Sequence, residues 1–193
     1  MTGRFRSCSA LMIVVAALIL CTPAAAQRTR WTEVHGGVAG AVDGWIAGGT
    51  NALDRGGEIG LARDWSGRWN SYGFGASWIA GKTAAPEQQM WGMILSSTFR
   101  IYLPTETVRP YGELGANLYL IGYEKIDAEE RERSFVNPGV SLGGGVAWRI
   151  RDDLDVRAGA ALHFAKIDFG MGGGGEGEDW FTGLVGLSFR RGR

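Results

Sequence analysis

The chain has 193 residues, with 20 basic and 20 acidic side chains and two cysteines. This charge balance argues against a nucleic-acid-binding protein, which would show a basic face. Both cysteines, Cys8 and Cys21, lie within the first 26 residues. A chain without that segment could form no disulfide, thiol nucleophile or cysteine metal site.

The N-terminal segment has the features of a secretory signal peptide. Arg4 and Arg6 precede an apolar run at residues 10–20, and three alanines at 24–26 offer a cleavage site. The apolar run is too short to span a bilayer comfortably. We therefore expect residues 1–26 to be removed on export.

The remaining segment, residues 27–193, is expected to form a single domain. It carries 18 basic and 20 acidic residues, a net charge of −2, because the signal segment holds two arginines and no acid. Lipoprotein processing at Cys21 is an alternative. It is disfavoured because Leu20 stands where lipid attachment requires a small residue.

Apolar residues recur at every second position along this segment, which predicts strands rather than helices. Eight strands are expected, over residues 31–41, 56–65, 69–82, 88–102, 109–125, 137–150, 154–168 and 180–190. Three connections are short (SGR, LPTETV and RDD), and they alternate with connections that are mostly longer and more polar. Short turns on one side and longer loops on the other are typical of outer-membrane barrels, whose short turns are periplasmic.

The stretch LDVRAGAALHFAKI, residues 154–167, shows the two faces of one strand. One parity carries bulky apolar residues such as Leu154 and Phe164, and the other mixes charges with Gly159 and Ala161. The second face of a soluble sandwich would meet water and be rich in Lys and Glu. Small residues instead suit the cramped interior of an eight-stranded barrel. We predict an all-β protein, an eight-stranded antiparallel transmembrane up-and-down β-barrel. A soluble barrel, which would invert the pattern, is the alternative.

Aromatic residues are expected to gather in two belts at the membrane interfaces. Nine fall near the short-turn rim: Trp31, Trp65, Trp69, Tyr72, Phe99, Tyr102, Tyr111, Trp148 and Phe189. Five fall near the opposite rim: Trp78, Trp91, Tyr123, Phe164 and Phe181.

Segments RPYGELGANLYLIGYE, NPGVSLGGGVAWRI and WFTGLVGLSFR resemble the small eight-stranded outer-membrane β-barrel family, which includes the transmembrane domain of outer membrane protein A. The resemblance covers essentially all of residues 27–193. It implies a bacterial outer-membrane location and insertion by the barrel-assembly machinery. Family members usually end on an aromatic residue that this machinery reads, whereas here Phe189 is followed by Arg-Arg-Gly-Arg.

Charged residues on the inward parity cluster towards the periplasmic end. The acids are Glu33, Asp64, Glu113 and Asp155, and the bases are Arg100, Arg149, Arg157 and Arg190. Buried charges must be paired, because an isolated one costs several kcal/mol. We predict a salt-bridged plug in the lower lumen, with His35 and Asn117 nearby; a gate built from the same residues is the alternative. Arg63 falls on the lipid-facing parity, where its side chain must snorkel to the rim.

Two features raise the question of catalysis or metal binding. Lipid A deacylases of the outer membrane use a His and a nearby Ser, but His163 is followed by Phe-Ala and points inward, so an interior histidine is favoured. GGGGEGED, residues 172–179, lacks the Lys and Ser or Thr of a phosphate loop. Its three acids could hold a hard cation, although a surface loop is the simpler interpretation. We expect no enzymatic activity, cofactor or metal.

The only lysines, Lys82, Lys125 and Lys166, all lie at the expected outer ends of strands. Snorkelling explains them simply, and contact with lipopolysaccharide phosphates is the sharper hypothesis. The sequence thus predicts a monomeric integral outer-membrane protein with a structural or surface-interaction role, in contact with outer-membrane lipid and lipopolysaccharide. The alternatives are a narrow gated porin-like channel for small solutes, an adhesin, and a lipid A-modifying enzyme.

Overall fold

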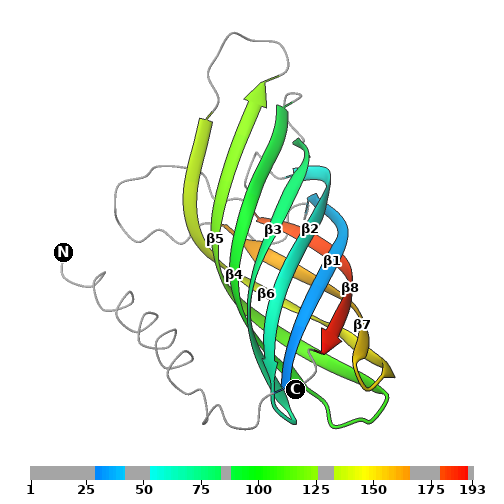
Figure 1. Ribbon diagram of the computed structural model, residues 1–193. Helices are drawn as coiled ribbons and strands as arrows, with labels where there is room; N and C mark the ends of the chain where they lie inside the picture. Colours follow the sequence, from blue (N-terminus) through cyan, green and yellow to red (C-terminus); the bar gives the residue numbers. More distant parts are fainter. Residues whose placement is uncertain (1–28, 42–52, 84–87, 126–132, 166–178, 191–193) are drawn as a thin grey trace, which may run out of the picture.

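The computed structural model describes residues 29–41, 53–83, 88–125, 133–165 and 179–190 (Figure 1). The predicted signal peptide at residues 1–26 lies outside the described residues. Eight strands follow in chain order: β1 (Thr29–Ala41), β2 (Leu53–Ser66), β3 (Asn70–Thr83), β4 (Gln88–Tyr102), β5 (Val108–Lys125), β6 (Arg133–Arg151), β7 (Leu154–Phe164) and β8 (Asp179–Arg190). Within the described ranges, no helix is long and apolar enough to cross a membrane.

The eight strands form one closed barrel in which each strand pairs antiparallel with its sequence neighbours. The barrel closes where β8 pairs back with β1, from Trp31 opposite Arg190 to Ala41 opposite Trp180. Closure leaves no sheet edge open along this seam, as a sheet in hydrocarbon requires. The predicted all-β, eight-stranded antiparallel fold is confirmed.

Side chains alternate between the wall and the lumen along every strand, as the period of two predicts. On the outside, Val38 is 66% exposed and Ile59 63% exposed, whereas Ile79 on the inside is 0% exposed. Such exposure of large apolar groups would be unfavourable in water, and it matches a wall that faces lipid. The two faces therefore have the orientation that the sequence predicted.

Three short turns lie at one end of the barrel, and each is hydrogen-bonded to the strand beyond it. Tyr102 N donates to Trp69 O in the β2–β3 turn at 2.8 Å. Arg149 N donates to Thr107 O in the β4–β5 turn at 2.8 Å, and Arg190 N donates to Asp153 O in the β6–β7 turn at 2.9 Å. These bonds satisfy backbone groups that would otherwise stay unpaired at the strand ends.

The barrel wall is not equally tall all round. β5 and β6 have 18 and 19 residues, whereas β7 and β8 have 11 and 12. β5 and β6 accordingly reach further at the end away from the short turns (Figure 1). β6 begins at Arg133 rather than at the predicted 137, because its pairing with β5 continues to Tyr123. β7 ends at Phe164, four residues before the predicted end at 168.

Three aromatic residues predicted for the short-turn rim point into the barrel. Trp31 and Tyr102 are 4% and 3% exposed, and Tyr111 lines the cavity inside the lumen. The reason is parity, because Trp31 lies two residues before the inward Glu33, and Tyr111 two residues before Glu113. Exposed residues on the outside of the same rim include Trp69, Trp148 and Phe189.

Candidate functional site: the lumen and the outer wall

Several interior charges lie beside a small residue on the neighbouring strand. Asp64 pairs in register with Gly73 of β3, and Arg157 pairs with Gly186 of β8. A Cβ built on Gly73 would meet the Asp64 carboxylate. Charged and very small residues therefore occur together on the inner face because the small residues leave the space that the long charged side chains fill.

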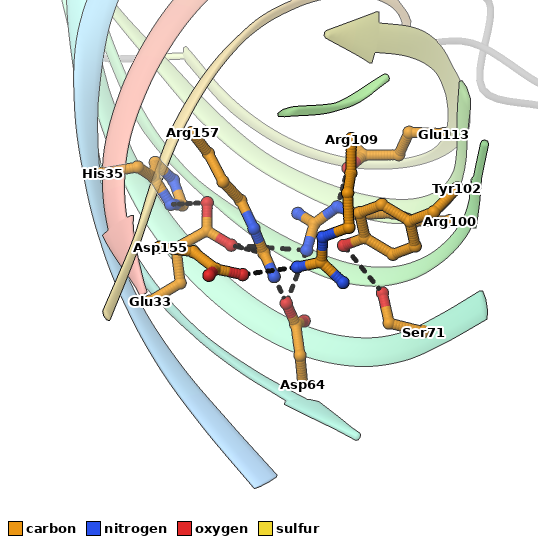
Figure 2. Close-up of polar contacts among 10 residues, drawn as sticks. All are labelled: Glu33, His35, Asp64, Ser71, Arg100, Tyr102, Arg109, Glu113, Asp155 and Arg157. Atoms are coloured by element: carbon orange, nitrogen blue, oxygen red, sulfur yellow. Dashed lines mark hydrogen bonds and ion pairs between the residues drawn. The ribbon is translucent and has the colours of Figure 1, made fainter. Parts of the chain in front are cut away.

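Two arginines and three acids form the main ion-pair layer of the lumen (Figure 2). Arg100 Nη1 and Arg157 Nη1 each donate to Asp64 Oδ2 at 2.6 Å. Both guanidinium groups also bond Glu33 Oε2, which lies 3.3 Å from Arg100 Nη1. Arg100 Nε donates to Glu113. These residues come from β1, β2, β4, β5 and β7, so the layer crosses the whole lumen.

A second ion-pair group lies nearer the short turns. Arg109 Nη2 donates to Asp155 Oδ2, and Arg149 Nε donates to Asp155 Oδ1 at 3.4 Å. The Arg109 guanidinium also lies 5.0 Å from the centre of the Tyr102 ring, a cation–π contact. The Tyr102 hydroxyl lies 3.3 Å from Ser71 Oγ. Asp155 is 0% exposed, so its charge relies on these two arginines.

Seven of the eight predicted plug residues take part in these two groups, and Arg190 does not. Arg190 is exposed, and no ion pair joins it to another described residue. It is the last residue of β8, where its guanidinium stays hydrated rather than buried. Arg109 supplies the fourth base instead, so four acids still face four bases. Its parity with Tyr111 and Glu113 was a signal in the sequence that could have identified it.

A cavity of about 70 Å³ lies in the lumen next to the main ion-pair layer. Its lining includes Glu58, Ser77, Ser96, Thr98, Asn117 and Ser141. Glu58 Oε1 lies 3.8 Å from His35 Nε2, and Glu58 Oε2 is buried with no hydrogen-bond partner among the described residues. A cavity of this size, with these polar groups in its lining, is able to hold several water molecules that would satisfy them. Asn117 Nδ2 donates to Ser141 Oγ at 2.9 Å.

His163 is an interior histidine with partners for both ring nitrogens. Its Nδ1 lies 3.1 Å from the Tyr119 hydroxyl, and its Nε2 lies 3.0 Å from Thr182 Oγ1. The imidazole stacks on the Trp180 indole, with ring centres 5.2 Å apart and planes 7° apart. Thr182 is 0% exposed and His163 is 7% exposed, so both side chains are buried inside the barrel.

Apolar side chains fill the lumen around Trp180, towards the end away from the short turns. The cluster comprises Ala39, Leu53, Ile79, Met90, Ile94, Tyr119, Ile121, Ala165 and Trp180. Ile79 and Tyr119 are 0% exposed and Trp180 is 1% exposed. The lumen is therefore filled by ion pairs towards one end and by apolar groups towards the other.

The outer wall carries arginine and lysine side chains at both ends. Arg63, on the lipid-facing parity as predicted, is exposed and lies 5.8 Å from the centre of the Trp65 ring, towards the short-turn end. Lys82 is exposed near the end of β3, opposite Arg55 of β2. Arg55 was not predicted, because it was assigned to the loop before β2. The side chain of Lys125 and all of Lys166 lie outside the described part of the chain.

The acidic loop at residues 172–179 also lies outside the described residues except for Asp179, which begins β8. Across the described strands, no group of three or more His, Asp or Glu residues could hold a metal ion. The alternative that this loop holds a hard cation therefore stays a prediction.

Comparison with known proteins places the fold. No protein-family model matches the chain, and no curated protein is significantly similar. The crystal structure of Neisserial surface protein A matches with TM-score 0.63 at 12% identity, covering 84% of this chain and 97% of that one. Ail, the attachment invasion locus protein of Yersinia pestis, matches in its complex with the heparin analogue sucrose octasulfate. Its TM-score is 0.54 at 12% identity, covering 85% of this chain and 98% of that one.

A third match is the outer membrane protein OprG from Pseudomonas aeruginosa, with TM-score 0.50 at 12% identity, covering 88% of this chain and 99% of that one. At such identities these likenesses concern the fold. They agree with the closed eight-stranded sheet and with the apolar wall seen here. The chain therefore has the closed eight-stranded β-barrel fold of these outer-membrane proteins, with large apolar side chains on the outside of its wall.

Proposed function

We propose that the protein is a closed, monomeric and non-enzymatic barrel whose role is structural or surface-interacting. This proposal rests on the observation that two separate groups of side chains occupy the lumen. The ion pairs around Asp64 and Asp155 occupy one part, and the apolar cluster around Ile79 and Trp180 occupies another. A solute would have to break both, and each is well packed because an eight-stranded barrel has little interior space.

Breaking the ion-pair layer alone would leave buried arginines and acids without partners. Removing one partner of a buried ion pair typically costs about 3–5 kcal/mol. The apolar cluster presents a second barrier of a different kind, because moving ions past desolvated apolar groups is also unfavourable. Under this proposal the chain's contacts with other molecules are made by its lipid-facing wall and by its outer end.

A narrow gated channel is the second candidate, and the cavity of about 70 Å³ inside the lumen favours it. In this alternative the cavity is one chamber of a pathway, and the ion pairs around Arg100 and Arg157 rearrange to open it. The two candidates make different predictions about conductance.

Planar-bilayer conductance of the refolded protein tests both candidates. We expect wild type to show no discrete current steps, because both fillings are intact. Arg100→Ala with Arg157→Ala removes the ion-pair layer, and Ile94→Ala with Trp180→Ala opens the apolar cluster. We expect each pair of substitutions alone to leave the barrel silent, and the four together to give discrete steps.

Each variant is first checked for folding by its shift in gel mobility on heating, so that silence is not confused with failure to insert. Discrete steps from wild type would contradict the closed barrel. Steps from the Arg100→Ala, Arg157→Ala variant alone would show that the ion-pair layer controls the pathway, in favour of the gated channel.

A further inference from the structure

Two positive side chains lie beside each other at the outer end of the wall. Arg55 of β2 and Lys82 of β3 are direct partners across the two strands, and both are exposed. They lie at the end opposite the three short turns, and this is the extracellular end in outer-membrane barrels. Among the described outward-facing residues at that end, they are the only arginine or lysine.

The local backbone places these two like charges together. The register between β2 and β3 runs without interruption from Ser66 opposite Ser71 to Arg55 opposite Lys82, and it shifts only beyond this pair, where Leu53 is opposite Thr83. Like charges directly opposite each other destabilise a sheet. No ion pair joins Arg55 or Lys82 to another described residue. A bound anion between them would remove this repulsion.

On the membrane side of Arg55 and Lys82, the outer wall carries very small residues first and large apolar residues next. The next outward partners towards the membrane are Gly57 and Ala80, and the following ones are Ile59 and Trp78. Trp78 stacks on Trp91 of β4, with ring centres 5.8 Å apart and planes 12° apart. Indoles of this kind sit at the level of lipid headgroups. The surface therefore presents two positive charges above small residues and paired indoles.

We propose that Arg55 and Lys82 bind a phosphate group of lipopolysaccharide in the outer leaflet, with an acyl chain lying over Gly57 and Ala80 beside Trp78. Lipopolysaccharide has its groups in the same order as this surface, because its phosphate lies at the headgroup and its acyl chains lie beneath it. Arg and Lys both bind phosphate, Arg through its planar fork and Lys as a point charge. This inference concerns the wall, so it is independent of whether the lumen conducts.

Binding of diphosphoryl lipid A to the refolded protein in detergent micelles tests the inference. Two positive charges near an anionic headgroup supply about 1 kcal/mol each, so we expect Arg55→Gln with Lys82→Gln to weaken binding about ten- to thirtyfold. Binding of fully dephosphorylated lipid A should be weak for wild type and unchanged by the two substitutions. Arg55→Lys, which keeps the charge, should retain most of the affinity.

Arg30→Gln with Arg68→Gln is the matched control, because it removes the same charge from exposed positions at the short-turn end. We expect this control to bind diphosphoryl lipid A within about twofold of wild type. Inorganic phosphate, which has no acyl chain, should not compete at the lipid concentrations used. The inference is overturned by any of three results: unchanged binding in the Arg55→Gln, Lys82→Gln variant, an equal loss in the control, or efficient competition by inorganic phosphate.

Discussion

Asp64→Ala is expected to destabilise the folded barrel by about 3–5 kcal/mol, because it removes one partner from a buried ion pair. Asp64 is 0% exposed and accepts a hydrogen bond from both Arg100 and Arg157 at 2.6 Å. After the substitution these two guanidinium groups share Glu33, and Arg100 keeps Glu113. The remaining acids cannot move into the position of Asp64, since their strands are fixed by the barrel.

Urea unfolding in lipid vesicles, followed by tryptophan fluorescence and by gel mobility of unheated samples, measures this free energy. Asp64→Asn keeps the shape of the side chain and isolates the loss of charge. Asp153→Ala is the control for an exposed pair, since Asp153 bonds Arg151 on the surface with side chains that are 60% and 65% exposed. We expect that control to change stability by at most about 1 kcal/mol. Equal effects of Asp64→Ala and Asp153→Ala would contradict a tightly packed ion-pair layer.

Gly37→Ala is expected to destabilise the barrel by about 3 kcal/mol or more and to lower the yield of folded protein, because it overpacks the seam between β1 and β8. A Cβ on Gly37 would overlap the carbonyl oxygen of Gly183 and lie 2.9 Å from the Leu184 Cα. Both neighbours are backbone atoms of β8, so relief requires the strands to separate where the barrel closes.

Gly36→Ala is the matched control, since it makes the same change one residue away on the opposite face of β1. The nearest atom to a Cβ there is the Glu58 carbonyl oxygen at 3.5 Å, an ordinary van der Waals contact. The fraction of each variant that resists unfolding in unheated gels measures the difference. If both variants fold with wild-type yield, the seam is looser than the structure shows.

The alternation of apolar and polar residues was sufficient to predict the fold and the direction of nearly every side chain. Strand parity depends only on the period of two, and one buried face fixes the register. Parity also accounts for the position of Glu33, Asp64, Arg100 and Arg157, whose side chains meet inside the barrel. Their pairing could not be predicted in detail, because it depends on which strands lie across the lumen.

The errors in the site prediction come from strand ends, where parity is not sufficient. Arg190 has inward parity yet extends into solvent, and Arg109 at the start of β5 takes its place. Arg55 was missed for a different reason. It has the outward parity of Gly57 and Ile59, but the predicted strand began one residue after it, at residue 56, so it was assigned to the preceding loop.

The charges inside the lumen neutralise one another only when the β-sheet has closed. Arg157 of β7 bonds Glu33, 124 positions earlier in the chain, and Asp64, 93 positions earlier. These partners lie on opposite sides of the β1–β8 seam, so they meet only after the first and last strands have joined. An open sheet in the bilayer would expose unpaired charges to hydrocarbon, which is strongly unfavourable. We therefore expect partly assembled forms to be poorly populated and insertion to be all-or-none.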